Sequence, residues 1–248
     1  MLGFIRRIGR RDGMMGGGPE VARGMVVPFT HPTCASAEAF EYLQRTVLTD
    51  DSASGELCEG FALKLAIRLV EVVEDQLAPV ANAMVEVWHC NAEGYYSGEN
   101  KGGIYDASDV DWLRGFQFTN RDGDVKFETI FPGWTTSHAV HIGARVRRYD
   151  GSGQNVIFDE TVKMFFKDGL ATKIGMFAPY TSNFQARTLN GNDADYRAAV
   201  EAGLSGGMDL DDSAYLWPIV MLTETKVDAR FYLVLAPCDD GQKLVCPV

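Results

Sequence analysis

Three stretches in the middle of the chain decide its fold. They read VEVWHCNAEGYYSG (residues 85–98), LRGFQFTNRDGDVKFETIFPGW (residues 113–134) and HAVHIGAR (residues 138–145). Each joins a short run rich in apolar and aromatic residues to turn-forming glycine, asparagine or proline, which is the pattern of β-strands separated by tight turns. The tetrapeptide NRDG (residues 120–123) is a turn signal, because glycine readily adopts positive φ. It predicts a β-hairpin over residues 115–130.

The same pattern continues on both sides of these stretches. At residues 61–70 phenylalanine, leucine and isoleucine occupy every second position, which predicts a half-buried strand. Because helices do not separate successive strands, a parallel α/β sheet is excluded, and the pattern favours an antiparallel sandwich or barrel. Further strands are predicted at residues 83–89, 139–147, 156–166 and 230–235, and helices at residues 35–48 and 193–202, the second opened by an aspartate cap.

Composition limits the classes of partner. The 248 residues are 46% hydrophobic and 23% charged, as in an ordinary globular protein with a sizeable core. A net charge of −11 argues against nucleic acid and anionic membranes as partners. No linker is evident, so we expect a single domain at residues 31–248. The glycine-rich residues 1–30 are expected to form a flexible or partner-docking arm.

The sequence indicates a reduced, cytoplasmic protein. No apolar run approaches the roughly 20 residues of a membrane span. The basic start of the chain lacks the apolar region of a secretory signal. The five cysteines show no metal-binding spacing, and their odd number favours free thiols. The sequence does not exclude one disulfide.

The quoted stretches resemble the intradiol ring-cleavage dioxygenases, which open catechols with a non-haem Fe(III). The resemblance covers residues 58–236 and rests on WHCNAEGYYS, PGW and HIG. It implies an all-β fold: an antiparallel β-sandwich with a few decorating helices and long loops. It also implies an iron site of two tyrosines and two histidines. Tyr96 matches the first tyrosine, and His141 matches the first histidine.

Four other site positions depart from the family's pattern. Thr135 follows the PGW turn where the second tyrosine is expected, and Gly143 replaces the second histidine. Residues i and i+2 of a strand face the same side, so a histidine pair there would grip one ion, whereas glycine offers no ligand. His138 stands in place of an arginine, and Lys163 in place of a glutamine. The resemblance therefore implies a degenerate iron site.

These departures define the candidate site. The catalytic candidates are Tyr96, His138, His141 and Lys163, and the substrate-binding candidates are Trp134, Thr135 and Arg114. Tyr96 and His141 are metal ligands only if a metal is bound.

Three hypotheses remain. The favoured one is a small-molecule enzyme with a repurposed pocket, in which histidine and lysine perform metal-independent isomerisation, cyclisation, dehydration or hydrolysis on a phenolic or polyketide-like substrate. No cofactor is favoured, and Fe(III) belongs to the second hypothesis, an oxygenase with an altered ligand set. The third is a non-catalytic subunit that pairs with an active homologue. The family analogy predicts a homo-oligomer or such a pairing.

Overall fold

The computed structural model describes only part of the chain. The predicted helix at residues 35–48 lies outside the described residues, and so does the predicted arm apart from strand β1 (Met25–Val26). That residues 31–248 form one domain stays a prediction. The described residues are 25–26, 58–73, 76–100, 102, 105–108, 111–205, 219–222 and 226–235.

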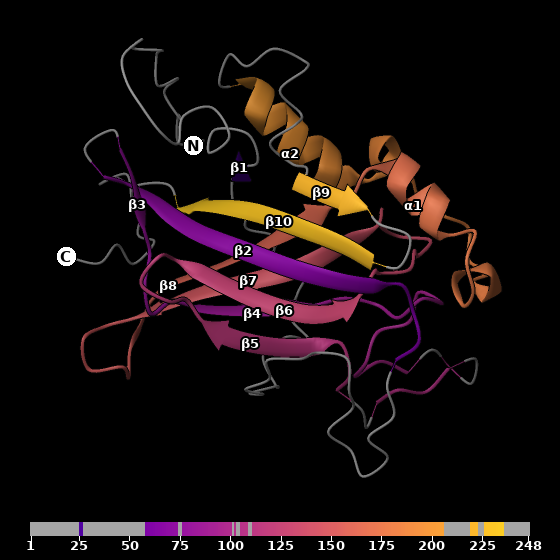
Figure 1. Cartoon of the computed structure of the whole chain (residues 1–248), viewed down its shortest axis with the longest axis horizontal. Coiled ribbons are helices and arrows are strands. Elements are labelled where there is room, and N and C mark those ends of the chain that lie inside the picture. Colours follow the sequence, from indigo (N-terminus) through magenta and orange to yellow (C-terminus); the bar gives the residue numbers. More distant parts are fainter. Residues whose placement is uncertain are drawn as a thin grey trace.

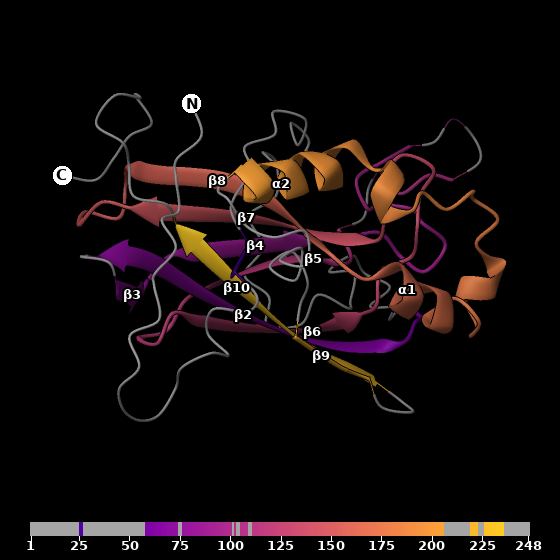
Figure 2. The ribbon, with the colours of Figure 1, turned by 90° about the horizontal axis from the view of Figure 1, so that it is seen from above.

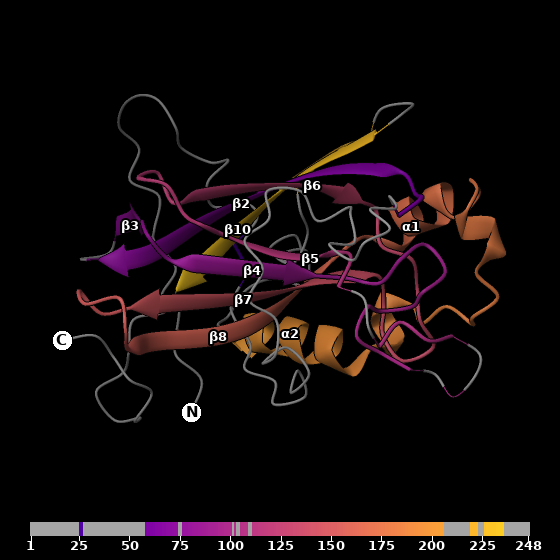
Figure 3. The same ribbon diagram turned by 90° about the horizontal axis from the view of Figure 1, so that it is seen from below.

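The strands form two layers, which are separate in Figures 2 and 3. The first sheet has the order β1-β10-β2-β3, with β6 also paired to β2 and β9 to β10. The second sheet has the order β5-β4-β7-β8. The bounds of the first sheet's remaining strands are β2 (Ala62–Val73), β3 (Gln76–Pro79), β6 (Asp124–Ile130), β9 (Ile219–Leu222) and β10 (Lys226–Leu235). Those of the second sheet are β4 (Met84–Trp88), β5 (Arg114–Phe118), β7 (His141–Tyr149) and β8 (Val156–Phe165).

The predicted period-two pattern places the core between these layers. Leu65 and Ile67 of β2 are 1% and 0% exposed, and they face Val87 and Ile142 of the opposite sheet within one buried cluster. Fully burying each such side chain contributes roughly 1.5–3 kcal/mol. The predicted β-sandwich and its strands at residues 61–70, 83–89, 139–147, 156–166 and 230–235 are confirmed, within a few residues at their ends.

The predicted hairpin at residues 115–130 is wrong. Strand β5 pairs with β4 in the second sheet, whereas β6 pairs with β2 in the first. The turn itself is present, with Gly123 at a φ of 77° and its N–H donating to the carbonyl of Asn120. It carries the chain from one sheet to the other. Turn residues specify the reversal of the chain, but the partner of each strand is set by distant residues.

Two of the described strand pairs depart from an antiparallel arrangement, and both involve β10, which also runs parallel to β1. Strand β10 runs parallel to β2 over its whole length, from the Lys226–Ala62 pair to the Leu235–Glu71 pair. It also pairs antiparallel with β9. The first sheet is therefore mixed, while every pair within the second sheet is antiparallel.

The described residues include two α-helices, and Figure 1 shows both of them outside the sheets. The predicted helix at residues 193–202 is α2 (Ala194–Ser205), which lies beside β8 in Figures 2 and 3. Its aspartate cap is confirmed, because Asp193 Oδ1 accepts the N–H groups of Asp195 and Tyr196 at 2.8 and 3.0 Å. Helix α1 (Asp168–Ile174) was not predicted. No described helix is long and apolar enough to cross a membrane.

A buried histidine links the two sheets by a hydrogen bond. His89 follows β4, and its Nδ1 lies 2.8 Å from the carbonyl oxygen of Cys90. A carbonyl only accepts hydrogen bonds, so Nδ1 carries the proton. His89 Nε2 therefore accepts the hydroxyl of Thr129 on β6, at 2.7 Å. Burial lowers the pKa of His89 to about 4, which keeps the imidazole neutral.

Replacing this histidine should change how stability depends on pH. Between about pH 4 and 6.5 the unfolded chain protonates His89 while the folded chain does not, so its contribution is present above pH 6.5 and is lost as pH falls. We expect the free-energy difference between the wild type and His89→Gln to rise with pH, by at most about 1.4 kcal/mol per pH unit. Urea unfolding at several pH values measures it. A pH-independent difference would show that folding does not lower the pKa of His89.

Candidate active site

The site is built on a row of residues that crosses the second sheet. In register, Arg114 of β5 lies opposite Trp88 of β4, Trp88 opposite Gly143 of β7, and Gly143 opposite Lys163 of β8. Opposite residues of neighbouring strands project from the same face, so the row shares the outer face of the sheet. All four residues line one cleft of about 230 Å³. Tyr96, Thr135, His138 and His141 line the same cleft.

The cleft thus brings together six of the seven residues predicted for the site. Trp134 is the exception, because it is not among the residues that line the cleft. Its indole N–H donates to the carbonyl of Gln185 at 2.9 Å, and the side chain of Gln185 does line the cleft. Trp134 therefore supports the wall. The catalytic and binding roles of the seven residues stay predictions.

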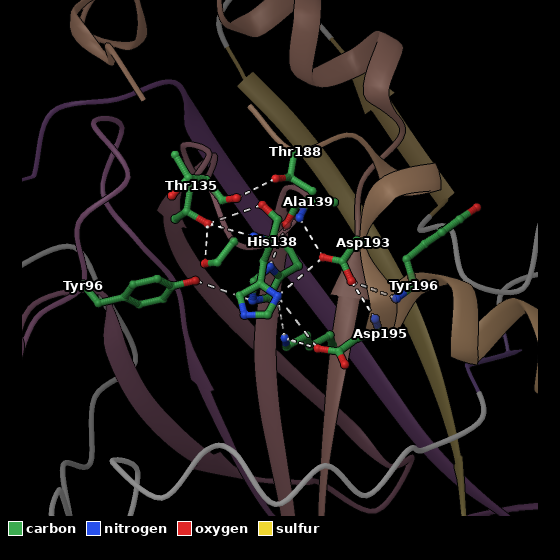
Figure 4. A network of polar contacts seen from close by, with 12 residues as sticks. Tyr96, Thr135, His138, Ala139, Thr188, Asp193, Asp195 and Tyr196 are labelled. Carbon is green, nitrogen blue, oxygen red and sulfur yellow. Dashed lines mark hydrogen bonds and ion pairs between the residues drawn. The ribbon is translucent and has the colours of Figure 1, made fainter. Parts of the chain in front are cut away.

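Tyr96 and His141 form the first contact pair in the cleft. Tyr96 Oη lies 3.5 Å from His141 Nε2, and Figure 4 shows the phenol directed toward the histidines. His141 Nδ1 lies 2.7 Å from the carbonyl oxygen of Ala139, which accepts its proton. His141 Nε2 consequently presents a lone pair to the tyrosine and the cleft. Burial, together with the charge of Lys163, lowers the pKa of His141 to about 3.

Lys163 and His138 form the second contact pair. Lys163 Nζ lies 3.2 Å from His138 Nδ1 and makes a short ion pair with the carboxylate of Asp195. Asp195 belongs to the first turn of α2. The carboxylate of Asp195 holds the ammonium of Lys163 in place, so Lys163 places a positive charge beside the cleft.

Asp193 connects this pair to the rest of the fold. Besides capping α2 through Oδ1, it accepts the N–H of Ala139 through Oδ2 at 2.7 Å, next to the start of β7 (Figure 4). Burial alone would raise the pKa of Asp193. The pKa is nevertheless lowered, because the backbone N–H groups of Tyr196 and Ala139 and the charge of Lys163 outweigh burial. The sequence indicates Asp193 as a helix cap, but no pattern in it signals the link between this residue and the site.

A ferric centre of two tyrosines and two histidines does not fit the residues present. Thr135 Oγ1 accepts the N–H of His138 at 3.1 Å, so its neutral hydroxyl is engaged in the local turn. At Gly143, an added Cβ would lie 2.4 Å from Trp88 Cε2 and 2.6 Å from Cζ2. The indole of Trp88 thus occupies the space into which a second histidine would project. Tyr96 and His141 are the two donors that remain of the family's four.

A second group of possible ligands lies nearby. Ligand atoms of His138, Asp193 and Asp195 fall within 4.8 Å of one another. The ammonium of Lys163 already contacts both His138 and Asp195. The ammonium group of Lys163 therefore already takes the position that a metal ion would need, and we assign no metal to these three residues.

Comparison with known proteins agrees with this fold. A family model described as Dioxygenase matches residues 41–147. An intradiol ring-cleavage dioxygenase from Tetranychus urticae is 22% identical with a TM-score of 0.61, over 83% of this chain and 92% of that chain. A second dioxygenase crystal structure is 21% identical with a TM-score of 0.62, over 83% and 91%. No curated protein sequence matches the chain.

At this level of identity the solved structures establish the fold. The chain has the β-sandwich of the intradiol ring-cleavage dioxygenases, and the resemblance inferred from its sequence is confirmed.

The close approach of Trp88 to Gly143 can be tested by adding one methyl group. Gly143→Ala should destabilise the protein by about 1–3 kcal/mol, because the Cβ overlaps the indole. Gly151→Ala is the matched control, since nothing lies within 4 Å of its added Cβ, and it should change stability by less than about 0.5 kcal/mol. In a Trp88→Ala background the added cost of Gly143→Ala should disappear. Chemical denaturation measures all four variants, and equal costs in both backgrounds would refute the overlap.

Proposed function

We propose that this protein is an enzyme that performs acid–base chemistry on a flat phenolic or polyketide-like molecule. The reaction would be an isomerisation, cyclisation, dehydration or hydrolysis without a four-ligand iron centre. One observation carries the proposal: the four catalytic candidates lie in one cleft as two contact pairs, Tyr96 with His141 and Lys163 with His138. The family's second histidine position is closed by Trp88.

The Tyr96–His141 pair provides a base and a hydroxyl group. His141 Nε2 carries a lone pair, and the Tyr96 hydroxyl can donate to a substrate oxygen. Because the pKa of His141 is lowered to about 3, it is a weak base. A weak base removes protons efficiently only from acidic positions. This favours a phenolic hydroxyl or a C–H group between two carbonyls, as phenolic and polyketide-like molecules provide.

The Lys163–His138 pair provides positive charge and a proton donor. Lys163 has only 14% of its side chain exposed and is held by Asp195, so its ammonium has a fixed position. A preorganised cation in a partly enclosed site stabilises the enolate or phenolate that forms when a proton leaves the substrate.

An iron oxygenase with an altered ligand set is the second candidate function. The observation that favours it is the 3.5 Å separation of Tyr96 Oη and His141 Nε2, since two adjacent donors can hold one ion. A bidentate substrate would have to complete the ligand set. Homo-oligomerisation, or pairing with an active homologue, remains our expectation for either candidate.

Turnover of a panel of phenols and polyketide-like compounds tests the proposed function. Acid–base chemistry leaves the product an isomer or changes its mass by one water, and it consumes no oxygen. His141→Ala and Tyr96→Phe should each lower kcat by roughly 10²–10⁴-fold. Tyr149→Phe is the matched control, because that hydroxyl contacts Met84 Sδ away from the cleft, and it should keep full activity. Full activity in both cleft variants would refute the proposal.

Metal analysis separates the two candidate functions. We expect protein purified after growth with iron to be colourless and to contain far less than one iron per chain, because the residues offer two of the four donors. Elemental analysis and the visible spectrum measure this. One bound iron per chain with a tyrosinate charge-transfer band, lost in Tyr96→Phe, would favour the oxygenase.

A further inference from the structure

We infer that Asp195 is a positioning residue which, through Lys163, holds His138 in the tautomer that donates its proton from Nε2. The inference rests on the proposed function for its catalytic meaning, but its structural content can be tested without a substrate. Three polar side chains, those of Asp195, Lys163 and His138, are joined by successive contacts. Asp195 binds the ammonium of Lys163, and that ammonium lies 3.2 Å from His138 Nδ1.

The direction of the second contact follows from the chemistry of the groups. A lysine ammonium has three protons and no lone pair, so it only donates hydrogen bonds. His138 Nδ1 must therefore accept, and the single proton of the neutral imidazole lies on Nε2. Lys163 is held in this position by Asp195, and its side chain is only 14% exposed.

Two carboxylates compete for the same nitrogen. Oxygens of Asp193 and Asp195 lie 3.6 and 3.8 Å from His138 Nδ1, beyond ordinary hydrogen-bond length. Each of them already accepts a closer donor: Asp193 Oδ2 accepts the N–H of Ala139 at 2.7 Å, and Asp195 accepts Lys163. With Lys163 in place, the lone pair of His138 Nδ1 thus accepts a hydrogen bond from the ammonium. Without Lys163, the carboxylates would favour a proton on Nδ1.

The neighbouring histidine has the opposite arrangement. His141 donates through Nδ1 to the carbonyl of Ala139 and keeps its lone pair on Nε2. The two rings lie 5.6 Å apart, nearly perpendicular at 83°. One imidazole is set to accept a proton and the other to donate one. The site therefore has a fixed direction of proton transfer.

This arrangement favours an isomerisation or a cyclisation among the proposed reactions. His141 Nε2 removes a proton from one atom of the substrate, and His138 Nε2 gives a proton to another atom. As it does so, Lys163 passes a proton to His138 Nδ1, which restores a neutral imidazole. The proton on His141 then returns through solvent to His138 Nε2, and His138 Nδ1 gives its proton back to Lys163, so that all three groups regain their starting forms. The substrate loses one proton and gains one, so its composition and oxidation state are unchanged.

Nitrogen-15 NMR of the histidine rings tests the inference directly in the full-length protein at neutral pH. We expect His138 with a bare Nδ1 and a protonated Nε2, and His141 with the reverse. In Lys163→Met, His138 should switch to the Nδ1-protonated tautomer, facing Asp193 and Asp195. In Asp195→Asn it should become a mixture of the two tautomers. Lys173→Met, which changes an exposed lysine of α1, should leave both patterns unchanged.

The His141 signal controls for folding in every variant, because its tautomer is set by the backbone of Ala139 and not by Lys163. A protonated Nδ1 on His138 in the wild type, or no switch in a folded Lys163→Met, would overturn the inference. Once a substrate is known, Asp195→Asn should lower kcat by roughly tenfold or more with little change in KM. If the tautomers are as expected but no compound is turned over, the proposed function fails while the arrangement of the histidines stands.

Discussion

The packing of the Trp88 indole against Gly143 is the contact on which the cleft depends. The indole forms the base of the cleft between Arg114 and Lys163. It also occupies the space that the family's second histidine would need. The contact exists because β4, β5, β7 and β8 keep a single register. That register is fixed by apolar residues on the inner face, where a slip of one residue would turn every side chain to the wrong side. The chemistry of the outer face is therefore positioned by the core.

Much of this arrangement could be predicted from the sequence. Period-two runs located the strands, and the spacing around Tyr96 and His141 placed both in one pocket, because the intradiol fold fixes where these segments meet. His138 and Lys163 were found by their coincidence with positions that the family uses for other residues. The structure adds that they touch each other, which sequence spacing does not indicate.

The parts that escaped prediction depend on contacts between distant segments. The turn at residues 120–123 is the same signal whether the strands around it share a sheet or change sheets, so the hairpin was wrong. Asp195 looked like an ordinary acidic residue in the first turn of a helix. It gains its role because the cap at Asp193 brings α2 against β8 and Lys163. Trp134 was placed by the PGW motif, but it supports the wall from behind.

The parallel pairing of β10 with β2 has a consequence for how the protein is made. A ribosome releases the chain from its N-terminus, so all four strands of the second sheet, ending at Phe165, emerge before β10 at residues 226–235. Until then one edge of β2 has no partner strand, whereas its other edge can pair with β6 and β3. That edge of β2 therefore stays unpaired while some sixty residues after β8 are made, so its backbone N–H and C=O groups are open to pairing with other chains.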